Sequence, residues 1–209
     1  MSRNHKIGLI FATMIEAQPF IDGLALRGYS TKPFPIFEND SIVLIISGIG
    51  KANAAMACTC MILIHQPLKV CNLGAAGATS IKSPLGECLH ISKIIEPDRP
   101  GIRSHRPHEH LTATLDGFET AVLATHDRPI TSVEDRRALS VHAELIDMEA
   151  ASIAQACRRL GTPCYIFKFV SDTPAHTGTG SIEKNIGLLG DSFYRYIRDR
   201  VLDILFRAV

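Results

Sequence analysis

Short, continuous apolar runs are the feature that most limits what this chain can fold into. Four of them lie at residues 6–12, 42–46, 70–73 and 165–170, and two further strand patterns lie at 87–95 and 121–125. Runs of this length suit strands better than helices, and an unbroken apolar strand has both of its faces buried. The runs therefore predict the interior strands of a sheet that helices cover on both sides.

Helical patterns separate these runs. They begin near residue 15 and cover residues 51–64, 148–160 and 181–206. Strands that alternate with helices predict an α/β fold, which we expect to be a three-layer α/β/α sandwich around a central mixed, largely parallel sheet. A single domain over residues 1–209 is expected, because the composition does not shift along the chain and this length suffices for one substantial core.

Composition argues against several classes of protein. The formal net charge is +1 and charged residues make up 21%, so no basic surface is expected to attract nucleic acid. No apolar run reaches the roughly 18 residues that span a membrane, and the chain passes from Met1 almost directly into its first strand. We therefore expect a cytoplasmic protein whose six cysteines are reduced, mostly buried and without a chemical role.

Polar or glycine-rich segments follow four of the predicted strands. They lie at residues 13–16, 47–50, 74–77 and 171–172, and we read those at 47–50 and 74–77 as turns. Ligands in α/β folds bind at the carboxyl ends of strands, so these segments predict a binding site. Glu16, Glu149 and Asp172 would bring three carboxylates to it. Acidic residues at a helix start can also simply complement its dipole, which is the alternative for Asp147 and Glu149.

Two other motifs are weaker. Gly48-Ile49-Gly50 lacks the third glycine of a dinucleotide-binding loop, because Asn53 stands at that position. Residues 97–111, which include three histidines, predict an irregular surface loop near the site, and the spacing of the histidines fits no helical face. We expect neither a metal ion nor a cofactor.

Five segments together resemble one known family. Residues 6–16, 47–51, 72–77, 147–150 and 170–172 occur in the order and spacing of the methylthioadenosine/S-adenosylhomocysteine nucleosidases. These enzymes form a branch of the nucleoside phosphorylase and nucleosidase superfamily. Residues 127–139 also resemble the hopanoid-associated (adenosylhopane) branch. The resemblance implies a phosphorylase/hydrolase-like fold, a purine nucleoside as substrate, and a homodimer in which the neighbouring chain helps to close the pocket.

The resemblance also implies roles for particular residues. Asp172 would be the general acid that protonates the purine near N7, and Glu16 would orient or deprotonate the attacking water. Glu149 would bind the ribose hydroxyls while Met148 packs against the sugar. The remaining substrate-binding residues implied by the resemblance are Ile49, Ala75, Gly77 and Ser171.

The sequence departs from the family at three positions. Ala75 replaces a serine, Pro129 stands where an aromatic residue would stack on adenine, and residues 177–180 lack the phenylalanine that lines the pocket for the 5′ group. Methylthioadenosine itself is therefore not the expected substrate, and a different or bulkier 5′ group fits better. The preference for adenine over another purine rests on the resemblance.

Hydrolysis is the expected reaction, with two alternatives left open. Many phosphorylases of the superfamily carry an arginine after the first strand, whereas Glu16 places there a carboxylate that would repel phosphate. A phosphorylase remains possible if Arg103, Arg106 or Arg128 enters the site from a loop. The other alternative is a nucleoside-binding module that has lost turnover.

Overall fold

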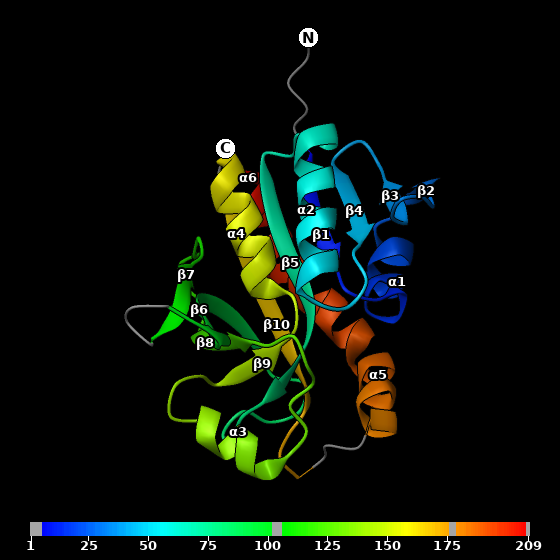
Figure 1. Ribbon diagram of the computed structural model, residues 1–209. Coiled ribbons are helices and arrows are strands. Elements are labelled where there is room, and N and C mark those ends of the chain that lie inside the picture. Colours follow the sequence, from blue (N-terminus) through cyan, green and yellow to red (C-terminus); the bar gives the residue numbers. More distant parts are fainter. Residues whose placement is uncertain (1–5, 102–105, 176–178, 208–209) are drawn as a thin grey trace.

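One mixed sheet of ten strands runs through the computed structural model, which describes residues 6–101, 106–175 and 179–207 (Figure 1). The strands are β1 (Ile7–Phe11), β2 (Arg27–Ser30), β3 (Ile36–Glu38), β4 (Ile42–Ile46), β5 (Lys69–Ala78), β6 (Cys88–Pro100), β7 (Pro107–Leu111), β8 (Thr120–Thr125), β9 (Leu145–Asp147) and β10 (Cys164–Asp172). Their order is β10-β6-β8-β9-β5-β1-β4-β3-β2, with β7 paired to β6.

The sheet closes on itself around β5. This strand pairs with β1, with β10 along most of its length, and with β9 at its last two residues. Strands β5, β10, β6, β8 and β9 therefore form a ring. Of the ten pairings among the described residues, five are antiparallel. The α/β fold with a mixed sheet is confirmed, but the sheet is more curved and less parallel than a plain sandwich predicts.

Helices cover the sheet on both sides. They are α1 (Met14–Gly23), α2 (Lys51–His65), α3 (Val133–Leu139), α4 (Ala150–Leu160) and α5 (Thr179–Ile197), which continues through a π-helical turn (Arg198–Leu202) into α6 (Asp203–Arg207). In Figure 1, α2 and α4 lie side by side on one face of the sheet. Helices α1 and α5 contact each other and pack in a second core, on the other face of β4. Val43 and Ile45 of β4 pack in the α2/α4 core, whereas Leu44 and Ile46 pack in the α1/α5 core. Both faces of the strand are buried, which explains its unbroken apolar run.

Several local predictions need correction. The glycine segment 74–77 is not a turn, because β5 runs through it to Ala78. Residues 97–111, predicted as an irregular loop, lie largely in the hairpin of β6 and β7. His110 of this hairpin is buried, and its Nε2 lies 2.8 Å from Glu96 Oε2. Arg103 and His105 lie outside the described residues.

Other local features agree with the sequence or add to it. All six cysteines are free, although Cys60 and Cys88 are only partly buried. The short elements β2, β3, β9 and α3 were not predicted from the sequence. Among the described residues, no helix combines the length and apolar character needed to cross a membrane.

Candidate active site

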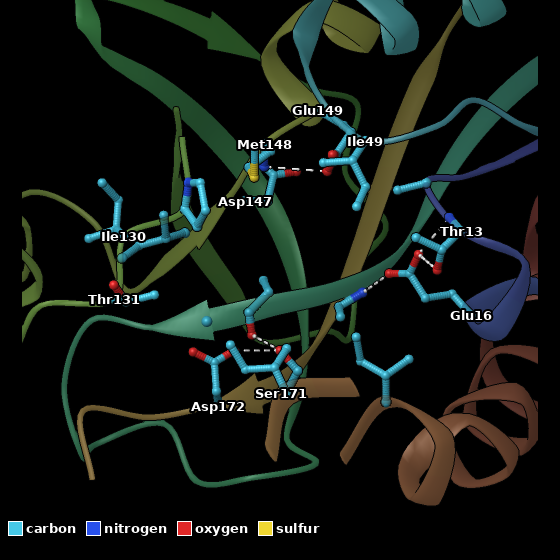
Figure 2. Close-up of a pocket in the computed structure, with 18 of the residues that line it drawn as sticks. Thr13, Glu16, Ile49, Ile130, Thr131, Asp147, Met148, Glu149, Ser171 and Asp172 are labelled. Carbon is cyan, nitrogen blue, oxygen red and sulfur yellow. Dashed lines mark hydrogen bonds between the residues drawn. The ribbon is translucent and has the colours of Figure 1, made fainter. Parts of the chain in front are cut away.

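All eight predicted site residues line one cavity of about 190 Å³. The cavity opens where β1, β5, β9 and β10 end, and Figure 2 shows its lining side chains. The residues that the structure brings together are Glu16, Ile49, Ala75, Gly77, Met148, Glu149, Ser171 and Asp172. Carboxyl ends of strands thus form the site as expected. The chemical role of each residue remains a prediction.

Glu16 lies in the first turn of α1, and three hydrogen bonds hold its carboxylate. Its Oε2 accepts from the backbone N–H of Thr13 at 2.9 Å and from the Thr13 hydroxyl at 2.6 Å. Its Oε1 accepts from the N–H of Ala75 at 2.8 Å, which ties α1 to β5. Gly74 makes room for this contact, because a Cβ there would lie 2.7 Å from Glu16 Oε1 and its φ of +148° suits glycine. The carboxylate is therefore fixed at the cavity wall.

Glu149 lies just before α4 and is almost fully buried. Its Oε1 accepts from the N–H of Gly50 at 2.9 Å, so it also satisfies a donor at the start of α2. Burial raises the pKa of Glu149 to about 7, and the charge of Asp147 acts in the same direction. Lys168 and the Gly50 N–H partly oppose that rise. Glu149 therefore changes charge close to neutral pH.

Asp147 and Lys168 form a buried ion pair beside Glu149. Lys168 Nζ lies 3.0 Å from Asp147 Oδ2, and Lys168 is only 2% exposed. Burial alone would lower the pKa of Lys168, but the charges of Asp147, Glu149 and Glu16 together raise it. Asp147 also accepts from the N–H of Ala150, so the capping interpretation holds for Asp147. Lys168 supplies a cation among the carboxylates.

Asp172 ends β10 and has a donor on each carboxylate oxygen. The Ser171 hydroxyl donates to Oδ1 at 2.6 Å, and Arg136 Nη2 donates to Oδ2. Gly77 makes this pairing possible, because a Cβ there would lie 2.9 Å from Asp172 Oδ2 and 3.0 Å from Arg136 Nη2. Sequence reasoning missed Arg136, since nothing in the sequence distinguishes it from the adjacent Arg137.

The rest of the lining is mainly apolar. Ile182 and Ile186 of α5 contribute to it, together with Pro129 and Ile130 from the segment before α3. Among the described lining residues none is aromatic, which agrees with the sequence departure at Pro129. Residues 177 and 178 lie outside the described part of the chain.

Comparison with known proteins identifies the class to which this fold and site belong. The sequence model of the phosphorylase superfamily matches residues 7–193, and the chain belongs to that superfamily.

Its similar proteins include named nucleosidases. The chain is 31% identical over 167 residues to the 5′-methylthioadenosine/S-adenosylhomocysteine nucleosidase of Geobacillus thermodenitrificans. This match covers 68% of this chain and 71% of the relative. It is 24% identical over 199 residues to the aminodeoxyfutalosine nucleosidase of Helicobacter pylori, with 80% and 85% of the chains covered.

A solved structure shares the fold. The 5′-methylthioadenosine/S-adenosylhomocysteine nucleosidase of Helicobacter pylori with butyl-thio-DADMe-Immucillin-A superposes with a TM-score of 0.83 at 20% identity. The match covers 97% of this chain and 100% of that structure.

Proposed function

We propose that this protein is a nucleosidase that hydrolyses the N-glycosidic bond of an adenine nucleoside and releases the free base. One observation carries the proposal: Glu16 of α1, Glu149 just before α4 and Asp172 of β10 line one cavity at the strand ends (Figure 2). The named relatives are nucleosidases, which supports this activity over others known in the superfamily.

Each carboxylate has a task in this reaction. The purine is a poor leaving group until it is protonated, and Asp172 is the group proposed to donate the proton at N7. General acid catalysis of this kind contributes about 10²–10⁴-fold to the rate. Glu149 accepts hydrogen bonds from the ribose hydroxyls, with Met148 against the sugar. Glu16 accepts the proton of the water that attacks C1′, the division of labour that two carboxyl groups show in glycoside hydrolysis.

Water is favoured over phosphate as the nucleophile. Each unit of negative charge 4 Å from Glu16 meets a repulsion of about 4 kcal/mol at an effective dielectric constant near 20. Both arginines among the described lining residues already have acidic partners: Arg128 lies 3.1 Å from Asp135, and Arg136 pairs with Asp172. Arg106 is exposed beside β7 and is not one of the residues that line the cavity. Hydrolysis therefore fits the described residues better than phosphorolysis.

The 5′ end of the substrate is proposed to be apolar and to differ from methylthio. Ile182 and Ile186 offer an aliphatic surface to such a group, and Ile49, at the cavity wall, is 55% exposed. Without an aromatic ring among the described lining residues, a small methylthio group gains less contact than it would beside one. The base itself would lie near Asp172.

The decisive experiment follows free adenine by chromatography. The protein is incubated with adenosine derivatives that differ at the 5′ position, with and without phosphate. Hydrolysis predicts adenine and free sugar at a rate that phosphate does not change. A sugar 1-phosphate that forms only with phosphate would identify a phosphorylase. Nucleoside binding without any product would identify a binding module. The Asp172→Asn variant keeps the shape of the side chain but cannot donate the proton, so it provides the inactive control.

We also propose a homodimer, a cytoplasmic location and one domain spanning the chain. The exposed face of α2 supports the dimer, because Met56, Leu63 and Ile64 are each more than half exposed there. Light scattering that gives an active species of about 22.8 kDa, the mass of one chain, would rule out this assembly.

A further inference from the structure

Arg136 is a buried cation of the cavity wall that the proposed reaction does not yet use. We propose that it is a positioning residue for the general acid: it determines which oxygen of Asp172 carries the proton, and it stabilises the carboxylate that remains after the proton has left. This inference rests on the proposed nucleosidase function and deepens it.

The guanidinium group of Arg136 is fixed at three points. Nε donates to the carbonyl of Ile130 at 2.9 Å, Nη1 donates to the carbonyl of Ala78 at 2.8 Å, and Nη2 donates to Asp172 Oδ2. Helix α3, which carries Arg136, is anchored by the Ser132 hydroxyl, which accepts from the N–H of Asp135 at 3.0 Å. The side chain is 3% exposed. Its three bonded nitrogens leave little freedom to reorient toward a bound anion.

The chemistry of the guanidinium group decides where the proton of Asp172 lies. Arginine has N–H donors and no acceptor, so a proton on Oδ2 would face a donor. The proton therefore belongs on Oδ1, the oxygen beside the Ser171 hydroxyl. Ser171 Oγ lies 2.6 Å from Oδ1 and 3.3 Å from the carbonyl oxygen of Ala76. It can donate to ionised Oδ1, or turn its hydrogen to Ala76 and accept from protonated Oδ1.

Arg136 also acts on the product of proton transfer. The proton leaves Asp172 Oδ1 for N7 of the base, and the electron pair of the C1′–N9 bond goes to the base. The water oxygen bonds to C1′ while its proton passes to Glu16. Asp172 is then a carboxylate in a buried site, where a charge-assisted hydrogen bond from a fixed guanidinium stabilises it more than water would.

The test compares two leaving groups. Adenine needs a proton to depart, whereas the 4-nitrophenolate of 4-nitrophenyl β-D-ribofuranoside does not. Arg136→Met should lower kcat/KM for an adenine nucleoside by about 100-fold, as the loss of one fixed donor to a developing charge does elsewhere. Cleavage of the nitrophenyl riboside should change little. Arg136→Lys keeps the charge but not the planar set of N–H donors, so its kcat/KM for the adenine nucleoside should lie between those of the parent and Arg136→Met.

Controls separate this role from a purely structural one. Arg137→Met alters the exposed neighbour on the same helix and should match the parent on both substrates. Circular dichroism and the stoichiometry of adenine binding by calorimetry report whether each variant has folded sites. Equal losses on both leaving groups, or no loss on adenine, would overturn the assignment of Arg136. A parent that releases no adenine from any adenosine derivative would overturn the proposed function, and this inference with it.

Discussion

The buried carboxyl group of Glu149 predicts an unusual pH dependence of stability. Its pKa is raised from an ordinary 4.5 to about 7, so between these values the folded protein holds a proton that the unfolded chain has released. The free energy of unfolding therefore falls as pH rises through this window, and the loss is complete above about pH 7. At about 1.4 kcal/mol per pKa unit, this shift corresponds to roughly 3 kcal/mol.

Glu149→Gln removes the ionisation and most of this pH dependence. Urea unfolding at about pH 5 and about pH 9 should show that the variant gains up to about 3 kcal/mol on the parent at the higher pH. Glu119→Gln, at an exposed glutamate, is the matched control and should follow the parent. Stability curves of the parent and Glu149→Gln that stay parallel across this range would refute the reasoning. In the parent, kcat/KM should fall below about pH 7, because protonated Glu149 is a weaker acceptor for the ribose hydroxyls that we propose it binds.

Three other substitutions test separate features. Gly74→Ala should lower kcat by about 100-fold in steady-state assays, because the added Cβ displaces Glu16. Gly117→Ala controls for backbone strain, because Gly117 has a φ of +82° and no atom within 4 Å of an added Cβ; equal effects of the two substitutions on kcat would exclude the displacement of Glu16. Lys168→Met leaves a buried carboxylate unpaired and should cost about 3–5 kcal/mol in urea unfolding, whereas unchanged stability would contradict the ion pair. Met56→Asp on α2 should convert the proposed dimer to a monomer in light scattering, and a persistent dimer would place the interface elsewhere.

The sequence predicted the parts of this site that follow from strand ends. Glu16 comes soon after β1 and Asp172 closes β10, and both strands pair with β5 in parallel. Their carboxyl ends must therefore meet at one edge, whatever the rest of the chain does. The unbroken apolar runs at β1 and β4 predicted burial on both faces, because an interior strand of a covered sheet has no face toward solvent.

What the sequence could not reveal depends on long-range pairing. The ring closes because β5 pairs with both β9 and β10, and no local pattern specifies either partner. Arg136 and Arg137 are adjacent and chemically identical, and only the packing of α3 decides that the first is buried. In the same way, His110 looks like a loop residue until β7 pairs with β6 and buries it beside Glu96.

The two glycines of β5 lie at a fixed spacing along that strand. Gly74 leaves room for Glu16, and Gly77 leaves room for Asp172 with its arginine. Three residues of extended chain span about 10 Å, so the strand spaces the two positions that contact the group proposed to activate water and the group proposed to protonate the base. A residue added or removed between Gly74 and Gly77 would move one of these positions by about 3.3 Å and reverse the direction of the side chains beyond it. Ile182 and Ile186 belong to α5 and not to β5, so the part of the cavity that we propose holds the 5′ group can change in size while the spacing along β5 stays the same.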